Sequence, residues 1–391
     1  MNFTEAFFDL KKQLYENEND VISSSGTRIH WQRFISCEAG RRPETEFLNE
    51  LRHEIPGVRN DENITQNREF DYPVFIPRGK EKNDGCILLL HGLNERKWDK
   101  YLSWADYLAS KTGKSVILFP ISFHVNRSLP EWSDRHILME RVEKRKQVYS
   151  LDSNESTFIN EALSERLTEA PERFFLSGLQ TADDIVCLLQ DIYDGRHPFF
   201  QRNTRSDIFA YSIGGMLAQV LFLANPDELL TDSKLMLFCA GSFFEDMYGV
   251  SKLIMDPVAY HKIYHYYLND LETEIKESGV FAEFFNQNKI GMAFRSMIAP
   301  DRFRNFREKV FRKKAGLIHA ISLKNDKVIP AAGISSALLG NSARIPSNME
   351  IIDFSFPHSH EIPFPVGKES IRKIVDEAFE RVFSRAAVFL S

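Results

Sequence analysis

The sequence has no apolar run approaching the ~18 residues that a membrane-spanning helix requires. Its first residues, MNFTEAFFDLKKQL, mix acidic, basic and apolar side chains, whereas a signal peptide has a continuous apolar segment. These absences argue against a membrane-spanning protein, and we expect a cytoplasmic one.

The sequence also lacks a surplus of basic residues. Its 49 Lys and Arg residues stand against 55 Asp and Glu residues, which gives a formal net charge of -6. A protein that binds nucleic acid must neutralise phosphate charges with Lys and Arg side chains. This balance excludes nucleic acid as the expected partner and favours a small-molecule substrate.

Cysteine is scarce. The four cysteines Cys37, Cys86, Cys187 and Cys239 lie far apart and form no CxxC or other metal-ligand spacing. Cys86 and Cys239 fall within apolar segments, where a free thiol behaves as a small hydrophobic group. We therefore expect four reduced structural thiols, a reducing compartment, and neither a metal ion nor an organic cofactor.

What the sequence does contain is an alternation of short apolar runs and amphipathic helical patterns. The expected strands are 71–77, 86–90, 115–120, 207–212, 234–240, 316–322 and 349–354, and the main expected helices are 97–111, 174–193, 215–224 and 368–388. Continuous apolar strands that alternate with helices are typical of a parallel sheet covered on both faces. The sequence therefore predicts an α/β fold with a doubly wound, mostly parallel sheet.

The remaining segments differ from this pattern. Residues 1–70 are polar, with two helical patterns at 3–16 and 44–54, and we interpret them as an N-terminal extension packed on the main domain. The strand at 71–77 contains Pro73, which predicts an edge position because proline donates no hydrogen bond to a neighbouring strand. Residues of about 122–155 form a charged, irregular insertion. We assign residues 71–241 and 316–391 to the core, and residues 242–315 to an insertion of helices rich in Phe and Tyr.

The strongest chemical signal is the pentapeptide AYSIG, in which Ser212 stands between an expected strand and an expected helix. A serine at such a sharp turn has a strained backbone, so the residues two positions before and after it must be small. Ala210 and Gly214 meet this requirement. The turn presents the hydroxyl at the N-terminus of a helix, where developing negative charge is stabilised. We therefore expect Ser212 to be a nucleophile, although a serine that only caps the helix would give the same pattern.

A second signal is the segment LLLHGLNE, in which a buried strand ends at His91 and Gly92. Stabilising an oxyanion requires two preorganised hydrogen-bond donors. The amide of Ile213, directly after the serine, is one candidate. Gly92 allows the loop after the earlier strand to bend close, which makes the amide of Leu93 the second. His91 is then expected to shape this loop.

With these motifs the chain resembles the α/β-hydrolase superfamily over roughly residues 70–390. The resemblance implies a catalytic triad in the chain order serine, acid, histidine. It assigns the acid to Asp326, which follows an expected strand. It places the histidine in the loop FPHSHEIPFP after the last strand, where both His358 and His360 are candidates. We favour His360 because it lies further from the strand, and we expect His358 to line the pocket.

The resemblance also implies that the insertion at 242–315 is a helical cap over the site. Its many aromatic residues favour an apolar acyl or aromatic substrate, although most of these rings must form the core of the cap itself. His91, His124 and His358 are the remaining residues that we expect around the substrate pocket.

The predicted activity is hydrolysis of a carboxylic ester or related acyl bond by a serine hydrolase with a Ser212–His360–Asp326 triad. Two alternatives stay open at this point. The same triad serves acyltransferases and peptidases, and a hydrolase fold without activity would serve as a binding module.

Overall fold

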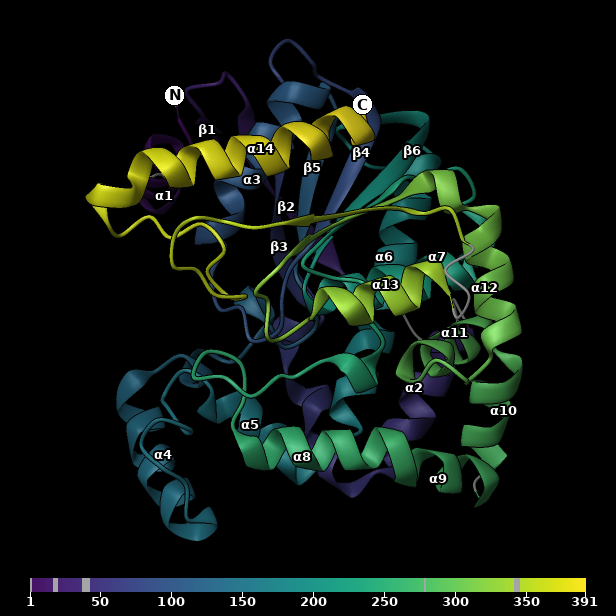
Figure 1. The fold of residues 1–391 in the computed structure, drawn as a ribbon. Helices are drawn as coiled ribbons and strands as arrows, with labels where there is room; N and C mark the ends of the chain where they lie inside the picture. The colour runs from purple at the N-terminus through teal and green to yellow at the C-terminus, as the bar shows by residue number, and fades with distance from the viewer. Residues whose placement is uncertain (1, 17–19, 37–42, 278, 341–344) are drawn as a thin grey trace.

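The computed structural model describes residues 2–16, 20–36, 43–277, 279–340 and 345–391, and its fold is drawn in Figure 1. Within these residues nine strands form one sheet in the order β1-β2-β3-β5-β4-β6-β7-β8-β9. The strands are β1 (Val21–Ile22), β2 (Arg28–Ile35), β3 (Glu69–Ile76), β4 (Asn83–Leu90), β5 (Ser115–Phe119), β6 (Phe200–Tyr211), β7 (Leu235–Phe238), β8 (Ile318–Leu323) and β9 (Asn348–Ile352).

The sheet is antiparallel at one end and parallel over the rest. β1, β2, β3 and β5 pair antiparallel in that order, whereas all the pairs from β5 through β4 to β9 are parallel. The parallel strands are apolar because both of their faces are covered. In β6, for example, Ile208 and Ala210 belong to one buried cluster, while Phe209 and Tyr211 belong to the cluster on the other face.

Helices cover both faces of the sheet (Figure 1). They are α1 (Phe3–Glu16), α2 (Pro43–Glu54), α3 (Asp99–Thr112), α4 (Arg135–Tyr149), α5 (Glu161–Glu169), α6 (Arg173–Tyr193), α7 (Ile213–Ala224), α8 (Pro257–His265), α9 (Leu271–Glu277), α10 (Gly279–Gln287), α11 (Lys289–Ile298), α12 (Arg304–Lys313), α13 (Ala331–Leu339) and α14 (Arg372–Leu390). Helices α1, α3 and α14 pack on one face. Helices α6 and α7 pack on the other, followed outward by the helices of the insertion.

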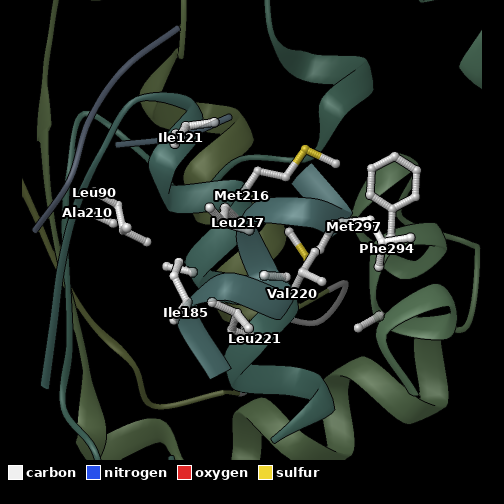
Figure 2. Packing of buried hydrophobic residues seen from close by; sticks show 14 of the residues in the cluster. Leu90, Ile121, Ile185, Ala210, Met216, Leu217, Val220, Leu221, Phe294 and Met297 are labelled. Atoms are coloured by element: carbon white, nitrogen blue, oxygen red, sulfur yellow. The ribbon is translucent and has the colours of Figure 1, made fainter. Parts of the chain in front are cut away.

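The buried cluster around α7 is shown in Figure 2. Leu90 and Ala210 from the sheet and Ile185 from α6 lie on one side of the helix, and Phe294 and Met297 from α11 lie on the other. Burying these apolar side chains contributes roughly 1.5–3 kcal/mol each to the free energy of unfolding, before the entropy of ordering them is subtracted. α7 is therefore held firmly between the sheet and the insertion. The doubly wound, mostly parallel α/β sheet predicted from the sequence is confirmed.

The first 70 residues contribute more than was expected of an extension. The predicted helices at 3–16 and 44–54 are present as α1 and α2, but β1 and β2 lie between them. β2 pairs along its whole length with β3. The N-terminal segment therefore continues the sheet itself in addition to packing on it.

The predicted edge position of the strand containing Pro73 is wrong. β3 lies inside the sheet, between β2 and β5. Its ladder with β5 consists of only two pairs, Val74 with Ile117 and Phe75 with Val116. Pro73 lies before this short ladder begins, so an inner strand tolerates it.

Two further expectations require correction. The stretch at about 122–155, expected to be irregular, contains the helix α4. Of the cysteines, Cys86 and Cys239 are free and buried, but Cys187 is disulfide-bonded, and Cys37 lies outside the described residues. The expectation of four reduced thiols is therefore wrong, and the inference of a reducing compartment loses its premise.

Among the described residues, no helix is both long and apolar enough to cross a membrane.

A buried ion pair connects the loop after β5 to α6. The side chain of Arg127 is fully buried and donates to Asp184 at 2.7 Å and to the carbonyl oxygen of Asn67 at 2.7 Å. Burial raises the pKa of Asp184 and lowers the pKa of Arg127, so each charge depends on its partner.

We expect Arg127→Met to lower the free energy of unfolding by about 3–5 kcal/mol, because it leaves the Asp184 carboxylate buried without its ion-pair partner. The double variant Arg127→Met/Asp184→Leu should recover much of this loss, since it removes both charges. Urea denaturation of the three proteins measures the difference. A double variant as unstable as the single one would contradict this account of the pair.

Candidate active site

The turn between β6 and α7 has the strained geometry expected of a nucleophile. Ser212 has φ 57° and ψ -129°, a region that residues with a side chain rarely adopt. A Cβ atom at Gly214 would lie 2.7 Å from the carbonyl oxygens of both Leu90 and His91, so only glycine fits at this position. A strained serine at a strand-to-helix turn, above a mostly parallel sheet, is the arrangement of the α/β-hydrolase fold. The predicted α/β-hydrolase fold is confirmed.

Two more glycines allow close packing around this serine. A Cβ atom at Gly215 would lie 2.5 Å from the Cβ atom of Ala240, at the end of β7. A Cβ atom at Gly92 would lie 3.2 Å from the Cβ atom of Ser212 itself. The loop after β4 therefore reaches the serine through a glycine, as the segment LLLHGLNE predicted.

His360 lies between Ser212 and Asp326. Its Nδ1 atom is 2.7 Å from Oδ2 of Asp326, and its Nε2 atom is 2.7 Å from Oγ of Ser212. Because an ionised carboxylate only accepts hydrogen bonds, Nδ1 carries the proton, which leaves the Nε2 lone pair to accept from the serine hydroxyl. The three residues are 5–7% exposed, so little water competes for these bonds. The structure thus brings together all three residues that were assigned to the triad.

Neighbouring groups hold this histidine and its acid partner in place. The other carboxylate oxygen of Asp326 accepts hydrogen bonds from the amides of Val328 and Ile329, each at 2.9 Å. The hydroxyl of Tyr211 donates to the carbonyl oxygen of His360, and the two rings are stacked with centroids 5.4 Å apart. Sequence reasoning missed Tyr211, because an aromatic residue at the end of a buried strand looks like any other core residue.

Three of the cavities in the described part of the chain lie in this region, and Ser212 lines two of them. The first, which we call the mouth, is lined by Ser212 and His360 and by several charged side chains. The second, the small cavity, is lined by Ser212, Leu93, Ile213 and apolar residues of the insertion. The third, the chamber, is lined by Leu93 and Ile213 and by mostly apolar residues of α5, α6, α7 and α11.

The two residues predicted to supply oxyanion donors flank these cavities. Leu93 and Ile213 line both the small cavity and the chamber. The neighbouring amide of Gly92 donates to the hydroxyl of Tyr101 at 3.0 Å, and this hydroxyl donates in turn to Glu95 at 2.7 Å. These bonds hold the loop in place through Gly92 and leave the next amide, that of Leu93, as the candidate.

Two of the three histidines expected around the pocket are absent from its walls. His91 is fully buried, with Nδ1 donating to the carbonyl oxygen of Gly92 at 2.7 Å and Nε2 accepting from the amide of Ile121 at 2.9 Å. It shapes the loop, as expected, but lines none of the three cavities. His358 packs against Phe354 and Phe356 and lines none of the three cavities, so its expected place in the pocket is wrong.

His124 does line the chamber. Its Nδ1 atom donates to the carbonyl oxygen of Ser122 at 2.9 Å, and its Nε2 atom has no partner among the described residues. Burial lowers the pKa of His124 to about 3, so the ring is neutral at physiological pH. No group of three or more metal-ligating side chains is found within the described residues.

A comparison with protein-family models gives a match over the whole length. The model of a family described as "Family of unknown function (DUF6051)" matches residues 1–391. The search of curated proteins finds no match.

Solved structures that resemble the chain have low sequence identity. Carboxyl esterase 2 of the mycorrhizal fungus Tuber melanosporum is 11% identical, with 83% of this chain and 81% of that chain covered and a TM-score of 0.42. A hyperthermophilic esterase of the archaeon Pyrobaculum calidifontis is 12% identical, with 98% and 90% covered and a TM-score of 0.41. The acylaminoacyl peptidase of Pyrococcus horikoshii is 12% identical, with 93% of this chain but only 41% of that chain covered and a TM-score of 0.42.

The buried histidine His91 predicts a pH dependence of stability. Burial, together with the charges of Lys100 and Arg127, lowers its pKa from 6.5 to about 4, against the opposing hydrogen bond to Gly92. Between these two pH values, His91 is protonated in the unfolded chain but stays neutral in the folded protein. The contribution of neutral His91 to the free energy of unfolding is therefore fully present above pH 6.5. It is lost as the pH falls toward 4, by about 1.4 kcal/mol per pH unit.

We expect His91→Gln to reduce the slope of unfolding free energy against pH between pH 7.5 and 5, as measured by urea denaturation. Glutamine keeps one donor and one acceptor but does not titrate. His261→Gln, at an exposed histidine, is the matched control and should leave the slope unchanged. Equal slopes for His91→Gln and the natural protein would contradict the prediction.

Proposed function

The chain belongs, over its whole length, to the family of unknown function DUF6051, and we propose that it is a serine hydrolase that cleaves a carboxylic ester or related acyl bond. The observation that carries the proposal is the pair of 2.7 Å hydrogen bonds through which His360 joins Ser212 to Asp326. A neutral imidazole held in this tautomer is ready to accept the serine proton.

In the first half of the reaction, Oγ of Ser212 attacks the acyl carbon while its proton passes to Nε2 of His360. The Asp326 carboxylate keeps Nδ1 protonated and stabilises the imidazolium that forms. The tetrahedral intermediate then collapses, and the leaving oxygen takes the proton from Nε2. The products of this half are an acyl-serine and a free alcohol.

The oxyanion of this intermediate forms where the chain offers backbone donors. The amides of Leu93 and Ile213 are the proposed pair, and the N-terminus of α7 adds a favourable dipole. The main chain at these two residues is held by Gly92 and by the turn at Ser212, so the donors need not reorganise during the reaction. Each such donor is worth about 10²–10³ in kcat.

In the second half, a water molecule enters through the mouth and gives a proton to Nε2 of His360 as it attacks the acyl-serine. Nε2 of His360 then returns this proton to Oγ of Ser212 as the carboxylic acid leaves. The helical insertion acts as a cap in this proposal, since Leu253 and Ile254 line the mouth and several of its apolar residues line the small cavity.

We expect Ser212→Ala and His360→Ala each to lower kcat for p-nitrophenyl butyrate by about 10⁴–10⁶, and Asp326→Asn by about 10⁴. The double variant Ser212→Ala/His360→Ala should be no slower than either single variant, because the residues act as a unit. Steady-state hydrolysis of the ester measures all four.

The matched control is His358→Ala, which removes a histidine two residues from His360 that lines none of the three cavities. It should keep the activity of the natural protein. Full turnover by Ser212→Ala would discard the proposal, and loss of activity in His358→Ala with activity retained in His360→Ala would reassign the base.

A further inference from the structure

The chamber begins beside the proposed oxyanion donors and follows one face of α7. Ile213, Met216, Leu217 and Val220 all line it, at the spacing i, i+3, i+4 and i+7 that places side chains on one face of a helix. Apolar residues of α5 and α6 form the opposite wall, among them Leu167, Phe175, Leu179 and Ala182. The chamber is therefore a mostly apolar cavity that begins at Leu93 and Ile213, while Ser212 itself lines the neighbouring mouth and small cavity.

The insertion forms a further wall of the chamber, through Ile290 and Phe294 of α11. Figure 2 shows Met216, Leu217 and Val220 on α7 with Phe294 next to them. Val220 is the last α7 residue on the wall, so it stands deepest along this helix.

The charged groups on the wall already have partners. Glu95 pairs with Lys100 at 2.5 Å, and Arg96 donates to the carbonyl oxygens of Phe158 at 3.1 Å and Ile159 at 2.6 Å. Arg166 and Arg173 line the chamber, and both bind the buried carboxylate of Asp61, at 3.0 and 3.1 Å. They consequently offer little charge to a ligand. Burying a carboxylate or an ammonium group in such a place would be costly without a free partner, whereas an apolar chain loses nothing.

The mouth carries more charged groups than the chamber. Lys97, Asp99, Lys100 and Glu361 line the mouth, next to Ser212 and His360, and do not line the chamber. A polar leaving group fits this side of the serine, and an apolar acyl group fits the other side.

We infer that the chamber holds the acyl chain of the substrate, with Val220 setting the chain length that fits; the inference rests on the proposed function. Seven residues of helix from Ile213 to Val220 span roughly 10 Å, at about 1.5 Å per residue. An extended alkyl chain advances about 1.25 Å per carbon, from bonds of about 1.5 Å and angles of about 111°. The substrate is thus an ester of a straight acyl chain of about eight carbons.

The experiment measures kcat/KM for p-nitrophenyl esters with acyl chains from acetate to palmitate. For the natural protein kcat/KM should rise with chain length to about eight carbons, by up to about fourfold for each methylene that enters the chamber, and should not rise beyond. Val220→Phe should move the optimum to shorter chains and lower the value for the octanoate by about tenfold or more. Val220→Ala should move the optimum to longer chains.

Two further variants test whether the effect on chain length is specific to the chamber. Leu221→Phe enlarges a buried residue of the same helix that lines none of the three cavities, and it should leave the chain-length profile unchanged. Ile263→Phe fills the small cavity instead. Circular dichroism of each variant confirms folding, and Val220→Ala, which adds no bulk, keeps the test decisive if Val220→Phe does not fold.

The outcomes are distinguishable. If neither Val220 variant changes the dependence of kcat/KM on chain length, the inference is overturned. If only Ile263→Phe changes it, the acyl chain lies in the small cavity instead. A natural protein that hydrolyses no ester of the series, with Ser212 also inert, overturns the proposed function itself and the inference with it.

Discussion

The candidate site depends on one backbone conformation, that of Ser212 at φ 57° and ψ -129°. Such strain costs about 1–3 kcal/mol and persists only where the surrounding structure enforces it. Here it is enforced by α7, which is packed between the sheet and the insertion, and by Gly214, where any side chain would collide with the carbonyl oxygens after β4. The strain turns the hydroxyl away from the helix and toward His360.

The parallel order of the sheet brings the partners of this serine to one edge. Asp326 follows β8 and His360 follows β9, so residues more than 100 positions apart in the chain meet where neighbouring strands end. Tyr211 adds a local link, because it belongs to β6 but holds His360 by ring stacking and by a hydrogen bond from its hydroxyl. The same edge opens to a charged mouth on one side and to the apolar chamber on the other.

Much of this was predictable where local sequence determines local structure. The apolar strands, the turn AYSIG and the order of Ser212, Asp326 and His360 needed only periodicity and the resemblance. β2 was not predictable, because RIHWQRFI mixes charged and apolar residues and gains its structure from pairing with β3. The chamber was not predictable either, since it arises from helices that are distant in sequence. Whether His358 or His360 reaches Ser212 depends on the conformation of the loop that carries both residues. The local sequence does not determine that conformation.

The most direct test of an activated serine is covalent labelling of the native protein by a fluorophosphonate, with the modified peptide identified by mass spectrometry. The account predicts one adduct, on Ser212, that is lost when the protein is unfolded in urea before labelling and strongly slowed in His360→Ala. Folded protein that takes up no label at Ser212, or labels it equally fast without His360, would contradict the account.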